Sequence, residues 1–407
     1  MSRWLLVLAV AAACMTQTLG VTNCLTNVFG LAPPKCITHG GLQRCWYTHT
    51  PQALVNKTGK APAVMLLHGL TGCADFIGQQ TGLLVEAERR GFFLVMPQGV
   101  FNLNQTMPAG QSALASEPSW NAGPCCGAAE KNQTDDSGFL AKVVDETVAT
   151  LPVNANRFYI AGHSNGAAMA ARFAVEHSDK VTAVAAVSFF LLVAPTNAYT
   201  TKLPYLEVHG TNDTTVPFEA ATFGAVANAG NVAAINGCTK GPRSQALTVS
   251  NKPYTRISYG GCDAPRSASE VVLVVVPNGT HQPFPLSGIP PFDNIINPDN
   301  FDSSKLVCDF LFDYERNGSV ITRTALVSPS PDYNSTALPP TAAPPTAAPP
   351  TAAPRAAPEG SLSTPSIVGI AVGVVALFVV LGVALIGRGS RPARTDDAVV
   401  GRRDLEK

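Results

Sequence analysis

Residues 157–169, with the sequence RFYIAGHSNGAAM, decide the fold of this 407-residue chain. An apolar run ends in Gly-His-Ser-Asn-Gly, and an alanine-rich segment follows. This is the G-x-S-x-G pattern in the context of a strand, a sharp turn and a helix. A side chain at either glycine would collide with the neighbouring strand or helix. The pattern predicts that Ser164 is an exposed nucleophile and that the Asn165 N–H points to where an oxyanion would form.

Short apolar runs alternate with segments of helical periodicity on both sides of this motif. The predicted strands are 63–67, 92–96, 157–161, 181–187, 203–208, 256–259 and 271–276, and the predicted helices are 76–90, 138–151, 167–177 and 302–316. This alternation predicts an α/β class with a mostly parallel sheet and helices on both faces. Ligand chemistry is then expected at the carboxyl ends of the strands.

The order of residues along the chain indicates the partners of the serine. In this fold an acid follows the serine, and a histidine follows the acid. Asp213 stands in a loop after a predicted strand, and His281, also after a strand, is the only histidine beyond it. We predict that Ser164 attacks, His281 transfers the proton and Asp213 holds the imidazole. The alternatives are an Asx-turn role for Asp213 and an ordinary loop position for His281.

The segment His-Gly-Leu-Thr-Gly at 68–72 closes the first predicted strand. Its histidine precedes the acid in the chain, so a structural role for His68 is favoured over a catalytic one. The site needs a backbone N–H from this segment, and we assign it to Leu70, with Thr71 as the alternative. Leu70 and Asn165 then form the predicted oxyanion hole.

Both ends of the chain carry membrane-targeting signals. Residues 1–20 resemble a secretory signal peptide, with Arg3, an apolar run and small residues before the expected cleavage. Residues 367–387 contain no charge and are long enough to cross a bilayer, and arginines follow them in the tail at 388–407. Repeated TAAPP between 335 and 366 predicts an extended stalk. The expected organisation is an extracellular head at 21–334, anchored as a single-pass type I membrane protein.

Cysteines and glycosylation sequons agree with an extracellular head. Nine cysteines remain after signal removal, so at least one is unpaired within the chain, and Cys238 with Cys262 is the favoured pair. N-x-S/T sequons begin at Asn56, Asn104, Asn132, Asn212, Asn278, Asn317 and Asn334. The sequons at Asn212 and Asn278 stand close to the predicted triad, where a glycan would narrow access to the site.

Composition excludes two broad classes. Hydrophobic residues make up 46% and charged residues 14% of the chain, and the formal net charge is zero. So few charges exclude a disordered protein and a highly basic nucleic-acid-binding protein. No nucleic-acid partner is expected.

Several motifs in order resemble a known family. They are LLHGLTG (66–72), PQG (97–99), WNAGPCCG (120–127), DDSGFL (135–140), RFYIAGHSNGAAM (157–169), HGTNDTTVPF (209–218) and NGC…YGGC (236–262). Over roughly residues 41–315 the chain is similar to the polyhydroxybutyrate depolymerase and feruloyl/acetylxylan esterase group of α/β-hydrolases. The resemblance implies serine hydrolysis of esters without a metal or cofactor, and it carries over the same triad. The family commonly has a Trp soon after the triad histidine. Here Phe284 takes that place, and Trp120 is the second candidate substrate-binding residue.

The sequence therefore predicts a membrane-anchored extracellular serine esterase. Its expected substrates are polymers or their fragments, with feruloyl or acetyl polysaccharide esters ahead of polyhydroxyalkanoate. One alternative is a catalytically silent adhesion or carbohydrate-binding head, although all three triad residues are present. Another is an acyltransferase that uses the same triad, with an alcohol in place of water.

Overall fold

The computed structural model describes residues 24, 31–100, 118–194, 199, 201–219, 224–249, 251–262, 268–282 and 301–324. Contacts divide the chain into two units, Met1–Thr341 and Ala342–Lys407, and all described residues lie in the first. The predicted signal, stalk, membrane span and cytosolic tail therefore lie outside the described residues. Within the described ranges, no helix is long and apolar enough to cross a membrane.

A ten-stranded sheet forms the centre of the head, in the order β1-β2-β4-β3-β5-β6-β7-β10-β9-β8. The strands are β1 (Lys35–His39), β2 (Leu42–His49), β3 (Ala61–Leu67), β4 (Phe93–Pro97), β5 (Val153–His163), β6 (Val184–Val187), β7 (Tyr205–Gly210), β8 (Lys240–Val249), β9 (Lys252–Gly260) and β10 (Val271–Val276). The six central strands of the sheet run parallel to one another, and they lie in the order β4-β3-β5-β6-β7-β10. The two outer strands at each edge pair antiparallel. This confirms the predicted α/β-hydrolase fold with its mostly parallel sheet.

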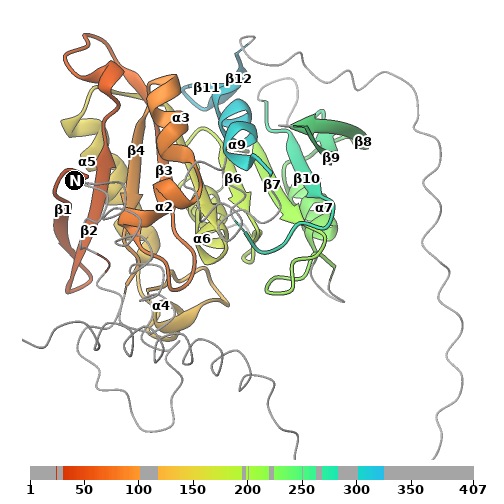
Figure 1. Ribbon diagram of the computed structural model, residues 1–407, viewed down its shortest axis with the longest axis horizontal. Coiled ribbons are helices and arrows are strands. Elements are labelled where there is room, and N and C mark those ends of the chain that lie inside the picture. The colour runs from red at the N-terminus through yellow and green to blue at the C-terminus, as the bar shows by residue number, and fades with distance from the viewer. Residues whose placement is uncertain are drawn as a thin grey trace, which may run out of the picture. The chain divides into compact units, whose positions relative to one another are not determined.

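Helices cover both faces of the sheet (Figure 1). They are α2 (Ala74–Gln80), α3 (Leu83–Arg90), α4 (Gly127–Lys131), α5 (Asp136–Thr150), α6 (Asn165–Glu176), α7 (Ala225–Ile235) and α9 (Ser303–Phe312), with a short 3-10 turn at Gln52–Leu54. Helices α2, α3 and α9 lie over one face, and α5 and α6 pack on the other. Because both faces are covered, the central strands are buried on both sides, and β4 is buried at every residue.

Two predicted helices differ from the structure. The helix expected at 76–90 is two helices, because Gly82 between them has a φ of +72°, a conformation that ends a helical turn. The helix expected at 302–316 ends at Phe312, and β11 (Tyr314–Asn317) follows. Gly318, with a φ of +61°, turns the chain back into β12 (Val320–Arg323). Asn-Gly is a hairpin signal that outweighs the helical pattern before it.

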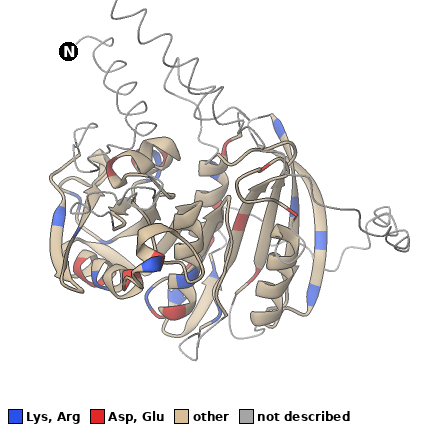
Figure 2. Ribbon diagram, turned by 90° about the horizontal axis from the view of Figure 1, so that it is seen from below, with Lys and Arg blue, Asp and Glu red and all other residues tan. Residues whose placement is uncertain are grey.

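The outer strands of the sheet were missed by the sequence analysis at β1, β2 and β8. Lys and Arg residues lie along the strands at the β8 edge (Figure 2). Seven of the ten residues in β8 are polar, glycine or proline, and most are exposed or half-buried. Such a strand lacks the apolar run from which the other strands were predicted. Charged residues and proline are common in edge strands because they discourage pairing with the strands of other chains.

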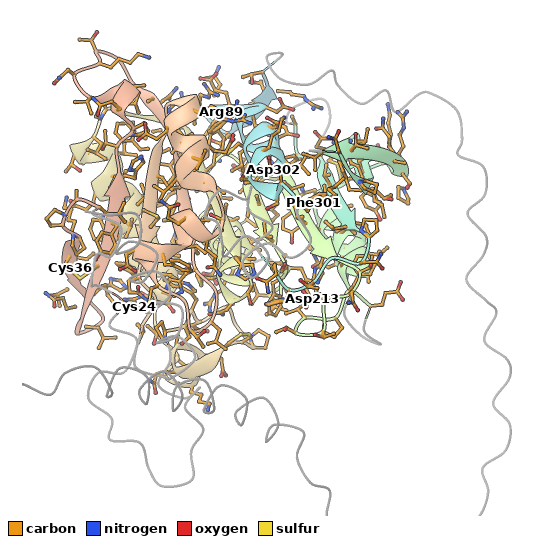
Figure 3. All side chains as sticks on the ribbon, viewed as in Figure 1. Cys24, Cys36, Arg89, Asp213, Phe301 and Asp302 are labelled. Atoms are coloured by element: carbon orange, nitrogen blue, oxygen red, sulfur yellow. A yellow bond between two sulfur atoms is a disulfide. The ribbon has the colours of Figure 1, made fainter. Side chains whose placement is uncertain are left out.

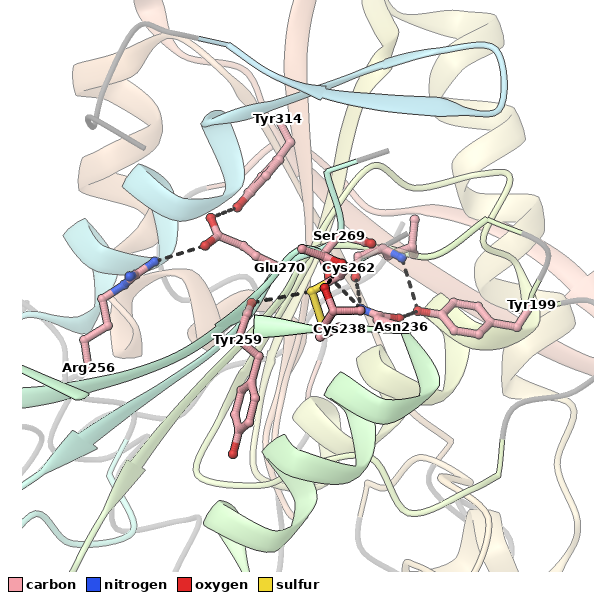
Figure 4. The surroundings of a disulfide bond; sticks show 12 residues. Tyr199, Asn236, Cys238, Arg256, Tyr259, Cys262, Ser269, Glu270 and Tyr314 are labelled. Atoms are coloured by element: carbon pink, nitrogen blue, oxygen red, sulfur yellow. Dashed lines mark hydrogen bonds and ion pairs between the residues drawn. A yellow bond between two sulfur atoms is a disulfide. The ribbon is translucent and has the colours of Figure 1, made fainter. Parts of the chain in front are cut away.

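Four disulfides join cysteines among the described residues of the head. They join Cys24 to Cys73, Cys36 to Cys45, Cys125 to its neighbour Cys126, and Cys238 to Cys262. The last, the pair favoured from the sequence, ties the end of α7 to the end of β9 (Figure 4). Beside it, the Asn236 amide donates to the carbonyls of Leu203 and Ser269 at 2.9 Å each. Among the described cysteines, Cys308 is the one without a disulfide partner, and burial raises the pKa of its thiol.

Candidate active site

Ser164 stands on a sharp turn between β5 and α6. Its φ of +53° and ψ of −127° are unusual for a residue with a side chain, and such a conformation costs about 1–3 kcal/mol. The turn is held because the Ser164 N–H donates to the Val187 carbonyl at 2.8 Å and the Ser164 carbonyl accepts from Ala167 at 2.8 Å. The Ser164 side chain is thereby lifted above the carboxyl end of the sheet.

The two glycines of the motif allow this turn to pack. A Cβ atom at Gly162 would lie 2.2 Å from the Gly166 carbonyl oxygen, and one at Gly166 would lie 2.4 Å from the carbonyl oxygens of Leu67 and His68. Those neighbours are backbone atoms that cannot move aside. The elbow helix therefore sits directly against β3 and β5, as the motif predicted.

The ends of β7 and β10 bring Asp213 and His281 together. A Cβ atom at Gly210 would lie 2.2 Å from the Gly279 carbonyl oxygen, and the Asn212 N–H donates to that carbonyl at 2.8 Å. The loop after β7 thus touches the loop after β10. This contact places Asp213 beside the histidine two residues beyond Gly279, although 68 positions separate the two in the chain. Asp213 is labelled in Figure 3.

Three side chains form a continuous hydrogen-bonded row. Asp213 Oδ2 lies 2.7 Å from His281 Nδ1, and His281 Nε2 lies 2.8 Å from Ser164 Oγ. The other carboxylate oxygen of Asp213 accepts the N–H groups of Thr215 and Val216 at 2.9 and 2.8 Å. Burial raises the pKa of Asp213, but hydrogen bonds from His209 and His281 outweigh it and hold that pKa well below its usual range. The carboxylate is therefore ionised and fixed at the back of the imidazole.

A cleft of about 640 Å³ opens in front of Ser164 and His281. Its walls are mainly apolar. They include Leu70, Phe189, Phe190, Leu192, Val216, Pro217 and the Cys125–Cys126 disulfide. A cleft of this size and character is typical of small-molecule sites, which bury an apolar group and orient it with few polar contacts.

The predicted oxyanion-hole residues both line this cleft. Among the described residues, the backbone N–H groups of Leu70 and Asn165 donate to no protein acceptor, so both are free for an oxyanion. The alternative, Thr71, is wrong because its N–H donates to the Pro118 carbonyl at 2.8 Å. Two free N–H groups beside the nucleophile are the arrangement that stabilises a tetrahedral oxyanion.

Comparisons with known proteins agree with this geometry. Residues 51–229, less than half of the chain, match the phospholipase/carboxylesterase family, and they include Ser164 and Asp213. NocK, a candidate esterase of Nocardia uniformis subsp. tsuyamanensis, is 26% identical over 260 residues, which cover 59% of this chain and 71% of NocK. These matches support a carboxylic ester hydrolase. They do not single out the polyhydroxybutyrate depolymerase branch.

Two of the solved structures that align with the chain are hydrolases. An acetyl xylan esterase from Aspergillus awamori aligns with a TM-score of 0.45 at 14% identity, over 61% of this chain and 94% of its own. A predicted CIB-like hydrolase of Thermoplasma acidophilum aligns with a TM-score of 0.39 at 16% identity, over 69% of this chain and 99% of its own.

The structure does not place Trp120 in the substrate cleft. Its side chain is fully buried, and the indole N–H donates to the His68 carbonyl at 2.9 Å. Its backbone N–H and carbonyl bind both ends of the Asn165 amide, at 2.8 and 2.9 Å. Trp120 is therefore a brace for the elbow, and the prediction of a substrate contact is wrong. The second candidate, Phe284, lies outside the described residues.

Other motif residues also support the site from behind. Asp136 pairs with the buried Arg44 at 2.5 Å and accepts the Asn121 N–H at 2.8 Å. His68, predicted to be structural, is buried and accepts the Gly99 N–H at 2.9 Å. Burial lowers the pKa of His68 to about 4, so it is neutral. These contacts fix the loop that carries Trp120.

Five sequon asparagines fall within the described residues, and all five are exposed: Asn56, Asn132, Asn212, Asn278 and Asn317. The sequons at Asn104 and Asn334 lie outside them. Asn212 and Asn278 stand on the two loops that carry the triad acid and base, so both could hold a glycan at the rim of the cleft.

Sequence reasoning missed His209, which lies behind Asp213. It is fully buried, with its Nε2 atom 3.4 Å from Asp213 Oδ2. The signal was present in the HGTND motif, where the histidine stands four residues before the acid.

Within the described ranges, no group of three or more His, Cys, Asp or Glu side chains is arranged to hold a metal ion.

Proposed function

We propose that this protein is a serine esterase that cleaves carboxylic esters through an acyl-enzyme intermediate. The observation that carries the proposal is the unbroken row from Asp213 through His281 to Ser164, with contacts of 2.7 and 2.8 Å. A hydroxyl is a weak nucleophile unless a base takes its proton as it attacks. His281 is within hydrogen-bond distance of that proton, and Asp213 holds the tautomer whose Nε2 can accept it.

The reaction proceeds in two balanced steps. Ser164 Oγ forms a bond to the ester carbonyl carbon while its proton passes to His281, and the carbonyl oxygen becomes an oxyanion beside the Leu70 and Asn165 N–H groups. His281 then protonates the leaving alcohol as the ester C–O bond breaks. Water repeats the sequence on the acyl-Ser164, which releases the carboxylic acid and restores the serine.

The cleft favours esters with an apolar acyl group. Phe189, Leu192 and Val216 present apolar surface beside Ser164, and burying such surface stabilises a bound acyl chain or ring at about 25 cal/mol per Å². We therefore propose feruloyl or related acyl esters on polysaccharides as substrates, with acetyl esters and polyhydroxyalkanoate as the other members of the class. Transfer to an alcohol instead of water would use the same acyl-enzyme.

A tethered, extracellular location completes the proposal. It rests on the signal at 1–20, the stalk at 335–366 and the apolar span at 367–387. The exposed sequons and the disulfides support an oxidising compartment. Antibody labelling of the head on intact cells that express the full chain tests this; labelling only after permeabilisation would contradict it.

Hydrolysis of p-nitrophenyl acetate and butyrate by the secreted head, residues 21–334, tests the activity, beside Ser164→Ala. We expect turnover that disappears in the variant. A folded head without turnover would refute the esterase, and retained turnover in the variant would refute the assigned nucleophile. A panel of methyl ferulate, acetylated xylan and hydroxybutyrate oligomers then ranks the substrates, and added alcohol reports acyl transfer.

A further inference from the structure

A buried cluster of ionisable groups adjoins the triad at Asp213. His209, the fifth residue of β7, is enclosed by the Phe190 and Phe218 rings, whose centroids lie 6.0 and 5.9 Å from its own. Glu207 stands two residues earlier on the same strand and is also fully buried. Neither side chain lines the cleft or is required by the proton transfers described above.

Among the described residues, the polar atoms next to the His209 ring are one carbonyl oxygen and two carboxyl oxygens, and all three accept hydrogen bonds when Glu207 and Asp213 are ionised. Nε2 lies 2.9 Å from the Val216 carbonyl oxygen and 3.4 Å from Asp213 Oδ2, and Nδ1 lies 3.3 Å from Glu207 Oε1. A neutral imidazole has one N–H and one acceptor nitrogen, whereas the imidazolium has two N–H groups. Only the charged form donates to acceptors on both sides.

The groups around the cluster fit a fixed cation. Asn228 of α7 donates its amide to Glu207 Oε2 at 2.8 Å, and the Tyr205 hydroxyl lies 3.5 Å from the same oxygen. Burial lowers the pKa of His209, but the hydrogen bonds that its ring donates to Asp213 and Glu207 outweigh burial and raise that pKa to about 9. Burial raises the pKa of Glu207, and the hydrogen bond from His209 lowers it by a smaller amount. The titratable groups that face His209 are thus Glu207 and Asp213, with Tyr205 behind the first and His281 behind the second.

We propose that His209 is a positioning residue of the esterase, a permanent imidazolium that holds the Asp213 carboxylate from behind and tunes the basicity of His281. The proposal rests on the proposed function, since it concerns the same triad. Asp213 Oδ2 faces both imidazoles, so its negative charge is shared between them. A cation at His209 weakens the attraction of Asp213 for a proton on His281.

His209→Gln and Glu207→Gln/His209→Gln test this role. In His209→Gln, the oxygen of the new amide faces the Glu207 carboxylate, and two acceptors repel each other. In the double variant, the amide at one position donates to the amide at the other, so this variant is expected to fold. In His209→Gln, loss of the cation should raise the pH at which kcat/KM falls to half on the acid side by about 0.5–1 unit, less than the ~1–3 units of a direct charge contact. The double variant also removes the Glu207 carboxyl group, so it should shift that pH by less. We also expect kcat to fall about tenfold, because Asp213 loses a partner that fixes its orientation.

A structural role would leave a different pattern. Wild-type acid-side pH dependence in folded His209→Gln would overturn the proposal, whatever the thermal stability of that variant. Nitrogen NMR of ¹⁵N-histidine-labelled head gives a readout independent of turnover, with His209 assigned by comparison with the double variant. Both His209 ring nitrogens should be protonated at pH 7, and a neutral ring would overturn the proposal. Failure of the wild type to cleave any ester would instead refute the proposed function and leave the NMR result intact.

Discussion

The substitution Trp120→Phe tests whether Trp120 supports the turn at Ser164 or contacts the substrate. The substitution keeps an aromatic ring but removes the indole N–H that donates to the His68 carbonyl at 2.9 Å. Both residues are fully buried, so that carbonyl would lose its partner without gaining water, which costs about 1–3 kcal/mol. The smaller ring leaves a void worth about 1 kcal/mol more. We therefore expect the free energy of unfolding to fall by about 2–4 kcal/mol.

Substrate binding should be nearly unchanged in the same variant. The Asn165 amide is held by the backbone of Trp120, and Phe has the same backbone. We expect a melting temperature roughly 4–16 °C lower, at ~2–4 °C per kcal/mol, but a KM for p-nitrophenyl butyrate within about twofold of the wild type. Scanning calorimetry at a fixed scan rate and initial-rate kinetics at 25 °C measure the two quantities.

Phe189→Ala is the matched control, because Phe189 is a half-buried residue that lines the cleft. It should lower kcat/KM for butyrate about 5- to 30-fold, which corresponds to ~1–2 kcal/mol of lost apolar contact, with little change in melting temperature. The reasoning about Trp120 would be refuted if its variant raised KM tenfold or more while melting like the wild type. That outcome would restore the substrate contact inferred from the sequence.

Three further predictions follow from single contacts. Gly166→Ala should prevent secretion of a folded head or cost more than about 3 kcal/mol, because its Cβ atom would lie 2.4 Å from two backbone oxygens; a secreted variant with wild-type melting would contradict this packing. His68 is buried and its pKa is lowered to about 4, so from pH 6.5 down to about 4 the unfolded chain binds a proton that the folded chain does not. The free energy of unfolding should therefore fall by about 1.4 kcal/mol per pH unit from this group, and a slope in His68→Gln equal to that of the wild type would be evidence against it. Asn278 is exposed in the loop that carries His281, so Asn278→Gln should remove one glycan and make the protein run faster on a denaturing gel. The variant should turn over a polymeric ester faster than the wild type, with no change for p-nitrophenyl acetate. Unchanged gel mobility would show that this sequon is unoccupied.

The sequence was sufficient for the centre of the fold but not for its edges. The buried parallel strands, such as β3 and β10, are continuous apolar runs, which distinguish them in the sequence from the more polar segments around them. The edge strand β8 is mostly polar, so its pairing depends on the neighbouring strand and leaves no local signal. The break at Gly82 was missed because apolar spacing continues through it, and only its positive φ reveals the end of α2.

The same contrast explains which site residues could be predicted. Ser164, Asp213 and His281 each follow a strand of one parallel sheet, so their convergence follows from topology, and chain order leaves a single histidine. Trp120 has no such constraint. An aromatic residue in a loop gives the same sequence pattern whether its ring faces the cleft or the elbow. The direction is decided by the fit of its backbone to the Asn165 amide and of its indole to the His68 carbonyl, and these contacts exist only once the loop has folded.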